Sequence, residues 1–186
     1  MNLFIKKFKA ESGLSLLELV VSIALFSFLI LASTQIFKMV IEGQRSSISA
    51  QNVQENIRYA MEKMSKEIRM AQVSNADCYG AAINKVFNMA GGGSELYFKN
   101  KDDVCVRYYL ENSRLKIDVN AGAQSGFITP TKIEVSNLKF FVVDNLIGAS
   151  GKQPYVTMKM DVKAIGQAIH EQKMKIQMTV SARYYE

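Results

Sequence analysis

The chain has very few of the side chains on which most enzyme active sites depend. Its 186 residues include one histidine, two cysteines and two prolines. The single histidine, His170, stands in the polar stretch GQAIHEQ, where we expect it to face solvent. No Ser/His/Asp or Cys/His set can be assembled from this sequence. The stretch GGGSE at 91–95 lacks the Lys-Ser/Thr pair of a phosphate-binding loop and is interpreted as a connector. We therefore predict no catalytic residues, no enzymatic activity and no cofactor.

Regularly spaced metal ligands are also missing. Asp102, Asp103 and Asp144 carry carboxylates that could bind calcium, but they lack the alternating spacing of a calcium-binding loop. The ten methionines indicate an adaptable core rather than a thioether metal site. We predict no metal site.

The sequence lacks the basic stripe that is typical of nucleic-acid-binding proteins. The formal net charge is +6, but Lys6, Lys7 and Lys9 crowd the N-terminus. Without residues 1–13 the chain has 20 basic and 16 acidic residues, a net charge of +4. These charges are mixed in sequence, and no arginine-rich run with interleaved aromatic residues occurs. The composition therefore disfavours nucleic acid as a partner.

Helix-breaking residues are missing from the first part of the chain. No proline occurs before Pro130, and Gly43 is the only glycine between Gly13 and Gly80. The pattern predicts one helix from about Leu14 to Val73, roughly 90 Å long, with a soft point at Gly43.

The first section of this helix is long and apolar enough to cross a membrane. Leu19–Phe37 contains no charged residue, and a helix needs about 20 such residues to cross the hydrocarbon layer. The preceding lysines predict a cytoplasmic N-terminus and an extracytoplasmic remainder. A cleaved secretory signal is the alternative, but the small-residue stretches 22–24 and 32–34 are poorly placed for cleavage. We predict a single-pass protein of the cytoplasmic membrane, in which residues 14–37 form the membrane helix.

Residues 38–74 read as an amphipathic continuation of the helix. Charged residues occupy one face, where Glu62 and Lys66 stand in the favourable i,i+4 order. Apolar residues recur on the other face at steps of four and three, and we expect them to pack under a sheet. They are Val53, Ile57, Met61, Met64, Ile68 and Ala71.

Residues 75–186 read as a β-rich head. Short β-prone runs at 95–99, 104–111 and 114–119 are separated by turn residues, and another run follows Pro130. Segments 156–163 and 174–181 alternate apolar and polar residues, which predicts antiparallel strands with one buried face. The predicted fold class is α+β, with a long N-terminal helix packed against an antiparallel β-sheet.

The stretch GLSLLELVVSIALF resembles the processing segment of type IV pilins and type II secretion pseudopilins. The resemblance implies that a prepilin peptidase removes the leader 1–13 by cutting between Gly13 and Leu14, and then methylates the Leu14 amine. Leu14 departs from the usual phenylalanine. Glu18 becomes the fifth mature residue, which this family nearly always keeps acidic. The resemblance further implies that Glu18 pairs with the Leu14 amine of a neighbouring subunit in a filament.

Later segments resemble the larger, J-type minor pseudopilins. QNVQENIRYAMEKMSKEIRMA is similar to the helix that follows the membrane segment in that group, and KMKIQMTVSARYYE is similar to its C-terminal strand. The implied partners are other pilins or pseudopilins, the peptidase, an inner-membrane assembly platform, and membrane lipid before assembly. The implied destination is a periplasmic or cell-surface filament. The alternative is a single-pass anchored binding domain whose Glu18 side chain reaches the membrane interface.

Cys78 and Cys105 are the whole cysteine content. An extracytoplasmic location permits oxidation, and a bridge would tie the end of the helix to a strand. Closing that loop should contribute about 3–4 kcal/mol on the chain-entropy model. Two buried thiols are the alternative.

Overall fold

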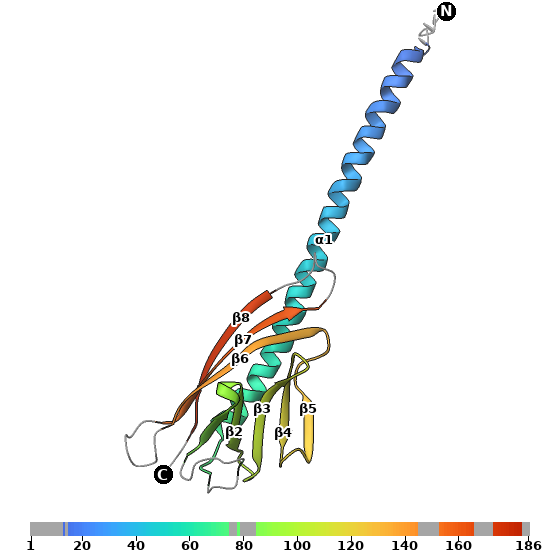
Figure 1. The fold of residues 1–186 in the computed structure, drawn as a ribbon. Coiled ribbons are helices and arrows are strands. Elements are labelled where there is room, and N and C mark those ends of the chain that lie inside the picture. Colours follow the sequence, from blue (N-terminus) through green and yellow to red (C-terminus); the bar gives the residue numbers. More distant parts are fainter. Residues whose placement is uncertain are drawn as a thin grey trace, which may run out of the picture. The chain divides into compact units, whose positions relative to one another are not determined.

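The computed structural model describes residues 13, 15–74, 78, 85–144, 153–165 and 173–183. Within them the chain forms one long helix, α1 (Leu16–Arg69), and then strands (Figure 1). The chain divides into two units, Met1–Gly43 and Gln44–Glu186. The elements after α1 are β1 (Phe87–Ala90), the 3-10 turn η1 (Gly91–Gly93), β2 (Glu95–Lys99), β3 (Cys105–Glu111), β4 (Arg114–Val119), β5 (Gln124–Phe127), β6 (Ile133–Val143), β7 (Tyr155–Ala164) and β8 (Lys173–Ser181).

Helix α1 includes Gly43, the expected soft point, and the division between the two units falls directly after this residue. In the second unit its apolar face is buried as predicted: all six residues of the predicted stripe, and Ala60 as well, are at most 9% exposed. The charged face is exposed, and there Glu62 pairs with Arg58 at 3.0 Å rather than with Lys66.

Five strands form an antiparallel sheet in the order β1-β2-β3-β4-β5. The predicted runs 95–99 and 114–119 coincide with β2 and β4. Asn112 and Ser113 connect β3 to β4 with φ of 50° and 55°. Two positive φ values in a two-residue connection are typical of the type I′ hairpin turn, whose twist matches that of the strands.

The last three strands form a second antiparallel sheet in the order β6-β7-β8. Strand β7 follows the predicted alternation closely, because Val156, Met158, Met160 and Val162 are all at most 2% exposed. Strand β6 alternates less regularly because a bulge lies between Ser136 and Lys139. Side chains face the core at odd positions before the bulge and at even positions after it.

Both sheets pack on the second part of α1 and share one core with it. Three buried rings from β1, β2 and β3 pack together: Phe98 packs edge-on against Phe87 at 6.1 Å and stacks with Tyr108 at 5.9 Å between ring centroids. The hydroxyl of Tyr108 donates a hydrogen bond to Glu67 of α1, so the buried phenol has a partner. The predicted α+β class, a long helix against antiparallel strands, is confirmed.

Two features of this fold were not predicted. The strands divide into two sheets rather than one, and β1 and β5 were missed. Both strands have only four residues, and β5 is mostly exposed, so neither has a strong two-residue period. The glycine-rich connector forms η1 between β1 and β2. There Gly93 has φ of 87°, and a Cβ atom would lie 3.0 Å from the Phe140 carbonyl oxygen, which explains the need for glycine.

Candidate functional site

The predicted processing site lies at the start of α1. The carbonyl of Ser15 accepts the N–H of Leu19 at 3.1 Å, and the helix begins at Leu16. Gly13 is exposed, and a Cβ atom built on it would have no neighbour within 4 Å. Leu14 lies outside the described residues. The described part of the chain therefore sets no steric limit at position 13.

Glu18 lies in the first turn of α1 and is exposed. The carboxylate makes no hydrogen bond or ion pair with any residue that the structure describes. The positive end of the helix dipole favours a negative charge in this turn. That effect amounts to about 0.3–1 kcal/mol at an exposed site, less than the few kcal/mol that a carboxylate costs within a membrane helix. Glu18 is thus a carboxylate without a full counterion in the described part of the chain.

The helix surface that follows Glu18 is apolar on all sides and exposed. Leu25 is 61% exposed, and Phe26 and Phe28 are 64% and 70% exposed. Among the described residues this is the one helix long and apolar enough to cross a membrane, and its most apolar window is not buried in the chain. This surface needs an apolar environment from outside the chain.

Two of the hydroxyl groups within this segment are satisfied by the helix itself. The Ser22 hydroxyl donates to the Glu18 carbonyl at 2.7 Å, and the Thr34 hydroxyl donates to the Ile30 carbonyl at 2.8 Å. Such bonds to the carbonyl four residues back replace water. These two side chains are therefore compatible with a water-free environment, whereas the Glu18 carboxylate is not.

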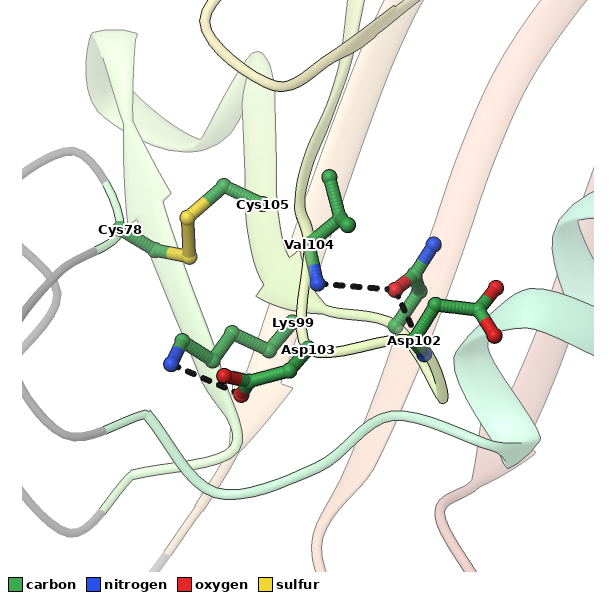
Figure 2. Close-up of a disulfide and its surroundings, with 7 residues drawn as sticks. Cys78, Lys99, Asp102, Asp103, Val104 and Cys105 are labelled. Carbon is green, nitrogen blue, oxygen red and sulfur yellow. Dashed lines mark hydrogen bonds and ion pairs between the residues drawn. A yellow bond between two sulfur atoms is a disulfide. The ribbon is translucent and has the colours of Figure 1, made fainter.

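Cys78 and Cys105 form the predicted disulfide, with their Cα atoms 5.4 Å apart (Figure 2). Val106 and Tyr108 face the core, so Cys105 lies on the opposite, outer face of the five-stranded sheet. Cys78 is fully buried. The bridge therefore fixes the segment after α1 to the outer face of β3.

A lysine beside the disulfide is buried as well. Lys99 pairs in register with Cys105 and is 3% exposed. Its Nζ lies 2.9 Å from the Asp103 carboxylate, in the turn that Figure 2 shows below the bridge. A buried ammonium group is stable only with such partners. This pair therefore has a structural role, supporting the turn between β2 and β3.

The three aspartates considered as calcium ligands do not converge. Asp103 pairs with Lys99, and Asp102 lies 3.7 Å from Lys101. Asp144 accepts the backbone N–H groups of Val86 and Phe87 at 2.7 and 2.8 Å. In the described ranges, no group of three or more His, Cys, Asp or Glu side chains could hold a metal ion. His170 lies outside those ranges.

The outer face of the five-stranded sheet carries a network of charged and aromatic side chains that sequence reasoning missed. Arg107 contacts the Glu95 carboxylate at 3.0 Å, and its guanidinium lies 4.0 Å from the centre of the Tyr109 ring. Tyr97 donates a second hydrogen bond to Glu95. Burial acts to raise the pKa of Glu95, but the hydrogen bonds from Tyr97 and Arg107 outweigh it and lower that pKa. These charges are thus matched within the sheet.

The network was missed because its members come from separate strands. Glu95 and Tyr97 belong to β2, and Arg107 and Tyr109 to β3. Each strand alternates polar with apolar residues, but only the pairing of Tyr97 with Arg107 brings the charges together. Sequence alternation gives the face on which a side chain lies and not its neighbour across the sheet.

No protein-family model, curated protein or solved structure matches this chain.

Proposed function

We propose that this chain is a minor pilin or pseudopilin, a structural subunit of a type IV pilin-like filament, most similar to the J-type subunits. The observation that carries the proposal is a carboxylate, Glu18, that has no partner among the described residues and lies at the start of an exposed apolar helix, five residues after Gly13. A subunit that is cut after Gly13 and packed beside another can pair this charge.

Cleavage supplies the counterion that the described chain lacks. Cutting between Gly13 and Leu14 creates an amino group, and methylation leaves its positive charge in place. In a filament, the Leu14 amine of one subunit lies against the Glu18 carboxylate of the next. Opposite charges attract strongly in a low dielectric, and the attraction is greatest when the two groups are in contact, so the pair sets the axial register between subunits.

The exposed apolar surface of α1 supports the same proposal. Membrane lipid covers it before assembly, and the apolar helices of neighbouring pilins cover it in the filament. The N-terminus faces the cytoplasm, where the prepilin peptidase acts, and the residues after the membrane helix are extracytoplasmic. An inner-membrane assembly platform transfers the processed subunit into the filament.

N-terminal mass spectrometry on protein from the cells that produce it tests the proposal. We expect a mature chain that begins with methylated Leu14. An intact chain that begins at Met1 would contradict the proposal and favour the alternative, a solitary anchored binding domain. Detection of one peptide decides between them, because the two functions require different N-termini.

A further inference from the structure

Strand β8 has one open edge. It pairs with β7 along its whole length, and among the described residues no strand pairs with its other side. The N–H of Ala182 donates to the Pro154 carbonyl at 2.9 Å. Because hydrogen-bonded pairs alternate along an antiparallel ladder, the even-numbered residues of β8 bond to β7. The odd-numbered residues therefore direct their backbone N–H and C=O groups outward: Lys173, Lys175, Gln177, Thr179 and Ser181.

Half of this edge lacks the usual protection against pairing. Proteins commonly guard open edges with charged side chains, lysine above all. Lys173 and Lys175 guard the first part of β8, whereas Ile176–Ser181 carries no charge. The edge also has no proline, and the register shows no bulge in β8. The second half of β8 is therefore competent to accept another strand.

A groove lies beside the unguarded half, between β8 and α1. It has a volume of about 330 Å³, and Met61 and Met178 supply its apolar lining. Such a groove suits the inward side chains of an added strand, since Ile176 and Met178 of β8 are only half-buried there. The other lining residues are Arg58, Glu62, Ser65, Lys66 and Arg69.

The rim of this groove is positively charged. Arg58 pairs with Glu62 at 3.0 Å. Lys66 and Arg69 are exposed and have no acidic partner among the described residues. A strand that carries carboxylates would complement both.

We propose that the open edge of β8 binds an extended, acidic segment of another protein by β-strand addition. The segment forms backbone hydrogen bonds with Gln177, Thr179 and Ser181, and every second side chain faces the groove. Among these inward side chains, apolar ones lie over Met61 and Met178, and carboxylates pair with Lys66 and Arg69. Backbone bonds supply affinity in this mode of recognition, and the alternate side chains supply specificity.

A second copy of β8 is a poorer occupant. Residues 173–181 include two lysines and no acid, so a second β8 would bring positive charge to a positive rim. The inference is independent of the filament proposal, because every residue in it belongs to the unit Gln44–Glu186.

Amide exchange on the full chain in detergent micelles tests the proposal. The probe is a labelled eight-residue peptide with threonine at every second position and with valine and glutamate alternating at the positions between, so that valine and glutamate share one face. The control peptide has lysine in place of glutamate. By NMR, the glutamate peptide should slow exchange at the amides of Gln177, Thr179 and Ser181 at least tenfold. The amides of Met178 and Val180, already bonded to β7, should change little. Absence of this odd-numbered pattern at millimolar peptide would overturn the proposal.

Two variants separate backbone pairing from charge. Gln177→Pro removes an outward N–H without breaking a bond to β7, and it should weaken binding of the glutamate peptide at least tenfold. The double variant Lys66→Glu/Arg69→Glu keeps the backbone edge and should reverse the preference between the two peptides. The control variant Lys101→Glu/Lys132→Glu makes the same charge change at residues that do not line the groove, and it should bind the glutamate peptide as the parent does. Equal binding by all three variants would overturn the proposal.

A concentration series identifies the competing occupant. If the odd-numbered amides become protected without peptide, and more so at higher protein concentration, a second copy occupies the edge and the proposed acidic partner is wrong. If binding persists in Gln177→Pro but is lost in Lys66→Glu/Arg69→Glu, the peptide binds by charge alone and strand addition is wrong.

Discussion

The two parts of helix α1 differ in whether the chain itself covers their apolar side chains. Before Gly43 the apolar side chains are exposed; Phe26, for example, is 64% exposed. After Gly43 the apolar stripe is buried against the chain's own sheets, and Met64 is fully buried. One continuous helix thus carries a surface that its own chain covers and a surface that it leaves uncovered.

The carboxylates of the two parts differ in the same way. Glu95, in the β-rich part, receives hydrogen bonds from Tyr97 and Arg107. Glu18, at the start of α1, has no such partner in the described chain. In the β-rich part the described chain thus covers the apolar stripe and pairs Glu95, whereas in the first part of α1 it covers neither the apolar surface nor Glu18. This difference supports the proposal that the first part of α1 contacts other molecules.

The largest expected effect concerns Gly13. We expect Gly13→Val to abolish processing, because a branched side chain would not fit the narrow cleft of the peptidase. Gly43→Val is the matched control: a Cβ atom at either glycine meets nothing within 4 Å in this chain. The N-terminal peptide is measured by mass spectrometry. Mature protein in the Gly13→Val strain would contradict recognition of Gly13 by the peptidase.

The next effect concerns Glu18. Glu18→Val should leave cleavage intact but reduce the subunit recovered in sheared filaments at least tenfold, because the Leu14 amine of a neighbour loses its counterion. Glu42→Val removes a carboxylate from the same helix, but one that lies 3.9 Å from its own Lys38, and should assemble nearly normally. Filament fractions are compared by immunoblotting. Normal assembly of Glu18→Val would refute the pairing.

A third prediction compares two methionines on α1. Met64→Ala should lower the free energy of unfolding by about 2–5 kcal/mol, since it leaves a cavity in the shared core. Met39 is 74% exposed, so Met39→Ala should change that free energy by less than about 0.5 kcal/mol. Denaturant unfolding followed by circular dichroism measures both. A large loss in Met39→Ala would mean that the chain does cover this surface.

Much of the fold could be predicted from the sequence because its signals are local. The buried stripe of α1 follows from apolar residues at every third or fourth position, and β7 follows from strict alternation of apolar and polar residues. The Cys78–Cys105 bridge was predicted because the expected extracytoplasmic location permits oxidation. These patterns depend on the residue and its near neighbours, so no knowledge of the tertiary structure was needed.

What could not be predicted depends on contacts between distant segments. The bulge at Ser136–Lys139 exchanges the faces of β6 in mid-strand, and the two short strands owe their pairing to their neighbours. The Glu95–Arg107 pair and the groove beside Met178 each join residues from different elements. The candidate processing site differs from these features, because Gly13 and Glu18 are close in sequence. Their motif can be identified from the sequence without the tertiary structure.

The smallest expected effect concerns the charge network of the sheet and sharpens the contrast between Glu95 and Glu18. A lowered pKa means that Glu95 binds its proton more weakly in the folded chain than in the unfolded chain. The resulting stability is present above the ordinary pKa of 4.5 and is lost as the pH falls below it. Glu95→Gln should therefore make the unfolding free energy less sensitive to acid, by at most about 1 kcal/mol because the pair is partly exposed. If Glu95→Gln retained the parent's full acid sensitivity, the charge of Glu95 would not be stabilised by the sheet, and the carboxylates of the two parts would differ less than the structure indicates.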